Sequence, residues 1–267
     1  MNKQEYLKQY KNQEDKVLLS FIIDKIKFVE TRNSIESTNF LNLYQVSLVE
    51  NFLKKIKYSN YSFWGGYEMA ERKVLILYPE RCNQIMLNKY FLKIMSVIRI
   101  KLPETEKGKY NHRNYLGGII KTGLDREKIG DILVKDDGAD IIALEEIKEY
   151  LIQELPLLKR FANSQISLQS IEELDIVIPK IEEIKIIIPS LRLDNFVSDL
   201  AKTSRNKAVD FIKNERVFVN GKLETKVSKQ IKIGDIITIR GKGRFVVKEF
   251  SGNTRSGRTI AVIEKYV

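Results

Sequence analysis

The residues of this 267-residue chain best suited to chemistry are cations that recur in one segment near its C-terminal end. The segment SRNKAVDFIKNERVFVNGK, residues 204–222, contains Arg205, Lys207, Lys213, Arg216 and Lys222. Such side chains donate hydrogen bonds to phosphate oxygens and neutralise their charge, which is the chemistry of nucleic-acid binding. The alternative is a solvated surface that happens to be basic.

The distribution of charge favours nucleic acid. Residues 191–267 hold 17 basic and 8 acidic residues, whereas residues 1–190 hold 29 and 27, within a total net charge of +11. A compositional bias toward lysine would spread the excess of positive charge along the whole chain. A surface that binds nucleic acid instead concentrates positive charge in one region, as residues 191–267 do. An anionic membrane could attract the same charge. However, the sequence has no long basic amphipathic helix and no lipidation motif, so no membrane partner is expected.

Two short helices, a strand and a tight turn are predicted to position these cations. Helical spacing gives the apolar faces Leu193, Phe196, Val197 and Leu200, then Ala208, Val209 and Ile212. Ser204 or Thr203 is the predicted N-cap, and no capping-box partner follows, which leaves first-turn amides available to a phosphate. Arg205 falls between apolar positions, so it must pair with a carboxylate, for which Asp194 is a candidate, or leave the core edge. Beyond Asn214 the period changes to two, and Asn220-Gly221 predicts a turn with positive φ.

This order of elements resembles the S-four domain, the RNA-binding module named after ribosomal small-subunit protein four. The resemblance lies in Arg192-Leu193-Asp194, Ser204-Arg205, Ala208, Ile212, VFVNGK and Gly234-Asp235-Ile237. It implies an RNA face. The side chains expected on or beside that face are Arg192, Ser204, Arg205, Lys207, Lys213, Arg216, Asn220, Lys222, Lys226 and Lys229, with Arg240 and Arg244 at its margin.

Three regions of an α+β protein are predicted. Residues 1–70 read as a helical region, residues 71–188 as a small two-layer α/β domain, and residues 189–267 as the S-four module with a basic β-hairpin tail. Within the central domain we expect helices at about 112–123 and 144–155, and strands at 73–79, 92–100, 129–134 and 182–190. The single cysteine, Cys82, precludes an intrachain disulfide and favours a reducing compartment. With no signal region and no long apolar stretch, a cytoplasmic location is expected.

The whole chain is similar to the YlmH family of bacterial S-four-domain proteins. Outside the RNA-binding module the most diagnostic stretch is HRNYLGGIIKTGLDREKIGDILV, from His112 to Val134. The resemblance implies binding to ribosomal RNA and tRNA on a large ribosomal subunit that carries a stranded peptidyl-tRNA, in ribosome-associated quality control. Quality-control proteins are then possible partners.

The alternative is an RNA-modifying enzyme of the pseudouridine synthase or methyltransferase type. Only about twenty residues follow the S-four module, and RGKGRF at 240–245 lacks the third glycine of a cofactor-binding turn. The only histidine, His112, gives no zinc set and no persuasive dyad with Cys82. Asp125, Glu127 and Asp131 lack the order of a calcium loop, and a hydrogen-bonded turn is the simpler interpretation. No catalytic, metal or cofactor site is expected, and non-enzymatic RNA binding is predicted.

Overall fold

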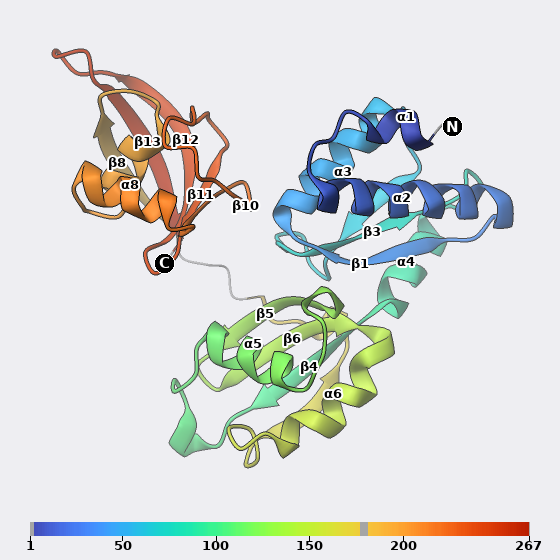
Figure 1. Cartoon of the computed structure of the whole chain (residues 1–267). Helices are drawn as coiled ribbons and strands as arrows, with labels where there is room; N and C mark the ends of the chain where they lie inside the picture. Colours follow the sequence, from blue (N-terminus) through green and yellow to red (C-terminus); the bar gives the residue numbers. More distant parts are fainter. Residues whose placement is uncertain (1–2, 177–180, 267) are drawn as a thin grey trace. The chain divides into compact units, whose positions relative to one another are not determined.

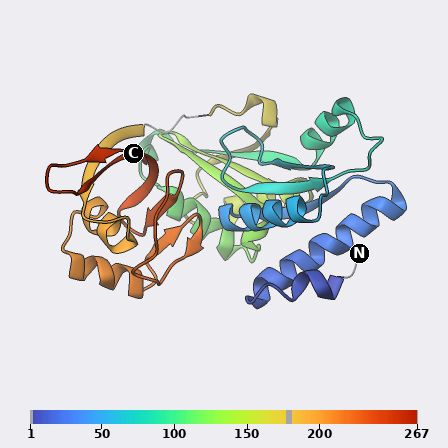
Figure 2. The same cartoon turned by 90° about the horizontal axis from the view of Figure 1, so that it is seen from above.

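A computed structural model describes residues 3–176 and 181–266 of the chain. They form two compact units divided between residues 177 and 178, and each unit is described by itself (Figures 1 and 2). Helices and sheets occur together in an α+β fold, as predicted. None of the helices in these two ranges is both long and apolar enough to span a bilayer.

The first unit begins with a three-stranded antiparallel sheet of order β1-β3-β2. The elements are α1 (Lys3–Leu7), α2 (Gln13–Arg32), β1 (Glu36–Leu41), α3 (Leu43–Lys55), β2 (Tyr61–Trp64), β3 (Lys73–Leu77) and α4 (Gln84–Lys93). The prediction of helices alone before residue 70 is corrected by β1 and β2. Both strands are short, and β1 opens with the polar residues of ESTNFL, so neither shows a clear alternation.

Strand β3 is buried on both faces, and this joins the two parts of the first unit. Leu75 and Leu77 pack in the core that contains α2 and α3, whereas Val74 and Ile76 belong to the core of the following sheet. The strand predicted at 73–79 therefore exists. It lies in the N-terminal sheet rather than in the central domain, and a boundary at residue 70 separates it from its partners β1 and β2.

The second sheet of this unit has order β5-β6-β4-β7, with every neighbouring pair antiparallel. The elements are β4 (Met95–Lys101), α5 (His112–Lys121), β5 (Ile129–Lys135), β6 (Gly138–Leu144), α6 (Lys148–Glu154) and β7 (Gln165–Gln169). This βαββαβ order with α5 and α6 packed on the sheet is the ferredoxin-like arrangement. The predicted helix at 144–155 begins later, at Lys148, because β6 continues to Leu144. β6 was not predicted because all seven of its residues are buried, which removes the alternation of a half-exposed strand.

Short 3₁₀ turns connect several of these elements. They are η1 (Glu104–Glu106), η2 (Arg126–Lys128), η3 (Glu145–Ile147), η4 (Leu155–Leu157) and η5 (Ile171–Glu173).

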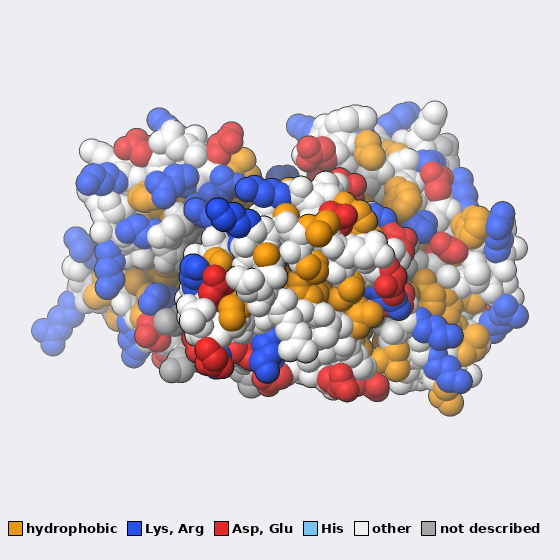
Figure 3. Space-filling model, turned by 90° about the horizontal axis from the view of Figure 1, so that it is seen from below, with side chains coloured by type: hydrophobic (Ala, Val, Ile, Leu, Met, Phe, Trp, Pro, Cys, Tyr) orange, Lys and Arg blue, Asp and Glu red, His pale blue; other side chains and the backbone are white. Residues whose placement is uncertain are grey.

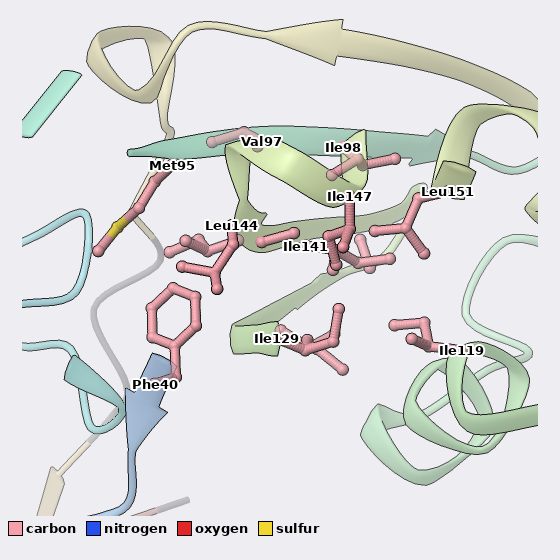
Figure 4. Close-up of a cluster of buried hydrophobic side chains, with 14 of the residues drawn as sticks. Phe40, Met95, Val97, Ile98, Ile119, Ile129, Ile141, Leu144, Ile147 and Leu151 are labelled. Atoms are coloured by element: carbon pink, nitrogen blue, oxygen red, sulfur yellow. The ribbon is translucent and has the colours of Figure 1, made fainter. Parts of the chain in front are cut away.

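Phe40 of β1, like Val74 and Ile76 of β3, belongs to the core that joins the two sheets. Its ring points toward Ile129 and Leu144 in the core of the second sheet (Figure 4). A Cβ atom added to Gly130 would lie 2.8 Å from Phe40 Cε1, so only glycine leaves room for the ring there. The N-terminal and central sheets are thus parts of one packed unit.

The second unit is built on a six-stranded sheet of order β10-β9-β11-β12-β13-β8. The elements are β8 (Ile181–Ile188), α7 (Leu193–Leu200), α8 (Arg205–Lys213), β9 (Val217–Val219), β10 (Lys222–Leu223), β11 (Ile236–Ile239), β12 (Gly243–Asn253) and β13 (Thr259–Tyr266). The strand predicted to end the central domain is β8, and its placement is corrected: it pairs with β13 along its whole length. The cause is its alternation, which sends Ile186 and Ile188 into the core of this unit beside Phe196.

Candidate nucleic-acid interface

Helices α7 and α8 form as their apolar spacing predicts. All four predicted apolar residues of α7 are buried, and in α8 Ala208 and Ile212 are buried while Val209 is half-buried. Ser204 is the N-cap of α8, and its hydroxyl accepts a hydrogen bond from the Lys207 backbone N–H at 3.3 Å. Local packing therefore places both helices, and the Ser204 cap fixes the start of α8.

A buried carboxylate lies between these two helix starts. Asp194 is 1% exposed, and its carboxylate accepts hydrogen bonds from Arg192 Nε at 2.9 Å and from Arg205 Nε at 2.7 Å. Burial alone would raise the pKa of Asp194, but the two guanidinium groups outweigh it and lower the pKa. The predicted pairing of Arg205 with Asp194 is confirmed. Because 56% of the Arg205 side chain is exposed, it remains accessible to a phosphate.

The loop after β10 brings two lysines to the same place. The backbone N–H of Leu193 donates to the carbonyl of Lys229 at 2.8 Å, and that of Asp194 donates to the carbonyl of Val227 at 3.2 Å. Lys226 and Lys229 are exposed on this loop. We name the resulting surface the α7–α8 basic face; it consists of Arg192, Ser204, Arg205, Lys207, Lys226 and Lys229.

Three lysines of this face have no carboxylate that neutralises their charge within the described residues. In the part of the chain that the structure describes, Lys207, Lys226 and Lys229 form no salt bridge, whereas Arg192 and Arg205 share Asp194. Figure 3 shows Lys and Arg side chains spread over the second unit, at the left of the picture. Exposed ammonium groups without a carboxylate partner are free to bind phosphate.

Three of the other predicted residues, Lys213, Arg216 and Arg240, lie at the far end of α8 from Ser204. Arg216 Nη2 donates to the Arg240 carbonyl at 3.0 Å, at the end of α8 opposite Ser204. Their guanidinium groups lie over aromatic rings, Arg216 over Phe211 and Arg240 over Phe218. Since α8 has nine residues, its two ends are about 13 Å apart. These arginines, with Lys213 in the last turn of α8, form a second group of cations.

Asn220 holds the predicted turn together. Its φ is 51° and that of Gly221 is 76°, which confirms the positive φ values expected for Asn-Gly. Its amide donates to Asp235 Oδ1 at 2.8 Å and accepts from the Ile236 N–H at 2.8 Å. Lys222 is exposed just after this turn. Asn220 thus has an evident structural role, and any RNA contact by this residue stays a prediction.

Arg244 lies on β12, with its guanidinium 5.2 Å from the centre of the Tyr266 ring. Two exposed arginines that were not predicted as site residues, Arg255 and Arg258, lie at the turn between β12 and β13. The sequence SGNTRSGR between two apolar runs marks this turn and could have identified them.

Asp131, one of the acidic residues considered for a cation site, is engaged by the protein itself. Asp131 accepts hydrogen bonds from the Tyr67 hydroxyl at 2.9 Å and from the backbone N–H groups of Glu71 and Arg72 at 2.7 and 3.1 Å. Burial raises the pKa of Asp131. These contacts confirm a hydrogen-bonded role for Asp131. Among the described residues, no three His, Cys, Asp or Glu side chains are grouped as metal ligands would be.

The helix pair, the strands that follow it and their basic face define the second unit as an RNA-binding module of the S-four class. Residues 191–237 match the family described as "S4 domain", and residues 93–175, which contain the ferredoxin-like sheet, match "Putative RNA-binding domain in YlmH". These two matches confirm the resemblance to the YlmH family of bacterial S-four-domain RNA-binding proteins.

One curated protein and one solved structure are also similar to this chain. The chain is 28% identical over 214 residues to "Ribosome-associated protein quality control protein P2" of Bacillus subtilis (strain 168), which covers 76% of this chain and 77% of the relative. The solved structure "Cell division protein ylmH from Streptococcus pneumoniae" matches 62% of this chain and 98% of that chain with a TM-score of 0.50 and 22% identity, which shows a likeness of fold. The family matches and the name of the relative support an RNA-binding role. Neither family description names a catalytic activity.

Proposed function

We propose that this chain binds structured ribosomal RNA and tRNA on the large ribosomal subunit, without catalysing a reaction, in the quality control of stalled peptidyl-tRNA complexes. The observation that carries the proposal is the α7–α8 basic face, which combines three exposed lysines without salt bridges among the described residues and two arginines fixed on Asp194. The name of the Bacillus relative supports the ribosomal setting. Because bacterial ribosomes occupy the cytoplasm, the proposal places the protein there.

The physical basis is phosphate recognition by a partly rigid surface. Asp194 holds the guanidinium groups of Arg192 and Arg205 in place, so less side-chain freedom is lost when they meet an RNA. Lys207, Lys226 and Lys229 add mobile point charges that replace the counterions of the RNA backbone. Such a surface recognises the positions of phosphates more than the identity of bases.

The test is a salt titration of binding to purified large subunits. We compare the full chain with Lys226→Gln/Lys229→Gln and with the control Lys8→Gln/Lys11→Gln, which removes the same charge from exposed lysines of the other unit. Each lost phosphate contact lowers the slope of log affinity against log salt by about 0.7–0.9, so the first variant should lose roughly 1–2 in slope and the control almost nothing. Equal slopes for all three proteins would contradict the proposed face.

The modifying-enzyme alternative calls for a different measurement. Mass spectrometry of ribosomal RNA and tRNA from cells that lack the protein should show every modification that the parent strain has. Loss of a modification that returns with the intact chain would overturn the non-enzymatic proposal.

A further inference from the structure

The longest hairpin of the molecule ends in two arginines. β12 and β13 pair from Arg244 and Tyr266 to Asn253 and Thr259, and residues 254–258 form the turn. The turn projects beyond the rest of the second unit (Figures 1 and 2). Both arginines, Arg255 and Arg258, are exposed on it.

The turn is held in a defined conformation. The Thr254 N–H donates to the Arg258 carbonyl at 2.8 Å, and the Gly257 N–H donates to the Thr254 carbonyl at 2.9 Å. The Thr254 hydroxyl accepts from the Arg258 N–H at 3.1 Å, and Gly257 supplies a φ of 76°. The two arginines, three positions apart, are therefore presented from an ordered turn.

The lysines of the hairpin strands have carboxylate partners, but among the described residues the arginines of the turn do not. On its strands, Lys248 pairs with Glu183 at 2.9 Å and Lys265 pairs with Glu182 at 3.1 Å. Within residues 3–176 and 181–266, no carboxylate forms a salt bridge with Arg255 or Arg258. The two lysines of the strands are thus paired with carboxylates, whereas the two arginines of the turn are not, within the described ranges.

The β12–β13 turn lies at the same end of the sheet as the start of α7. Thr259 lies opposite Ile188 across the sheet, and the chain runs from Ile188 to the start of α7 at Leu193. The turn and the start of α7 therefore lie at the same end of the sheet. One RNA could contact both.

We propose that the β12–β13 turn is a second RNA contact, in which Arg255 and Arg258 bind phosphates of the same structured RNA as the α7–α8 basic face. This inference rests on the proposed function. Phosphate is the favoured ligand because guanidinium groups bind phosphate oxygens in pairs of hydrogen bonds. The other turn residues, Thr254, Ser256 and Gly257, offer no apolar side chain for the core of a protein–protein interface.

The experiment is the same salt titration on large subunits with the full chain. Arg255→Gln/Arg258→Gln should reduce the slope by about 1–2, whereas Lys8→Gln/Lys11→Gln should not. Combined with Lys226→Gln/Lys229→Gln, the losses should add to roughly 2–4. Circular dichroism checks that the hairpin variant is folded, which its exposed turn position favours.

The failures are distinguishable. If Arg255→Gln/Arg258→Gln gives the control slope while Lys226→Gln/Lys229→Gln does not, the second contact is overturned and the proposed function stands. If the hairpin variant leaves binding to naked ribosomal RNA unchanged but releases the chain from the subunit, the turn contacts a ribosomal protein, which also overturns the inference. If the unmodified chain binds neither large subunits nor naked ribosomal RNA, the proposed function itself is overturned.

Discussion

Replacing Asp194 by asparagine tests whether the buried carboxylate holds the starts of α7 and α8 together. Asparagine keeps the shape of the side chain but replaces one oxygen by an N–H donor. Since Arg192 and Arg205 approach both oxygens, that donor faces a guanidinium N–H whichever way the amide lies. At least one charge-assisted hydrogen bond is lost, and Asp194 is too buried for water to replace it.

The size of the effect follows from these contacts. A hydrogen bond to a charged group contributes about 1.5–3 kcal/mol, and the partly exposed arginines recover part of this in water. We expect Asp194→Asn to lower the free energy of unfolding of the second unit by about 1–2 kcal/mol. The fraction of molecules in which this unit is unfolded then rises on the order of tenfold.

The assay is hydrogen–deuterium exchange of peptides from α7 and α8 in the full chain. Fluorescence would not serve, because the only tryptophan, Trp64, lies in the first unit. The control is Asp210→Asn, which makes the same substitution at an exposed position of α8. Unchanged exchange in the Asp194→Asn peptides would refute the assigned role of the carboxylate.

The pH dependence of the same comparison has a defined sign. The pKa of Asp194 is lowered from its ordinary value of 3.8 in the folded chain, so below that value the unfolded chain binds the proton first. Its contribution to stability is complete at neutral pH and is lost as the pH falls through the lowered pKa. The difference in exchange between the unmodified chain and Asp194→Asn should therefore shrink below about pH 4.

Two further substitutions test the site and the core. Arg205→Ala should weaken binding to large subunits by about 1–3 kcal/mol with little change in melting temperature, since Arg192 still pairs with Asp194; a large fall in melting temperature with intact affinity would show a structural role instead. Gly130→Ala should destabilise the first unit by roughly 1–3 kcal/mol because its Cβ would lie 2.8 Å from Phe40. Urea unfolding followed by Trp64 fluorescence measures this, and Gly117→Ala, where a Cβ meets nothing within 4 Å, is the control that should not be destabilised.

Local patterns predicted the second unit well. The stripe of α7, the Ser204 cap and the Asn220-Gly221 turn each depend on neighbouring residues, and all three appear in the structure. The pairing of Arg205 with Asp194 could also be inferred, because the carboxylate lies on the preceding helix.

The missed features depend on partners distant in sequence. β8 faces β13, some eighty residues later, and nothing in its alternation identifies that partner rather than the central sheet. β3 is a continuous apolar run because its two faces pack into two different cores. The run alone does not show which sheet the strand belongs to. Likewise, Arg216 and Arg240 are as basic as Lys226, yet only the path of the loop to α7 places Lys226 on the α7–α8 basic face.

The fit of Phe40 over Gly130 has a consequence for the synthesis of the chain. The phenylalanine leaves the ribosome 90 residues before the glycine that receives it. At bacterial elongation rates of about 5–20 residues per second, the interval is roughly 5–18 s. During that time one face of the N-terminal sheet lacks its cover, although the helices on the opposite face are already available to fold. The newly made chain thus passes through a stage with exposed apolar surface, to which chaperones that recognise such surfaces can bind.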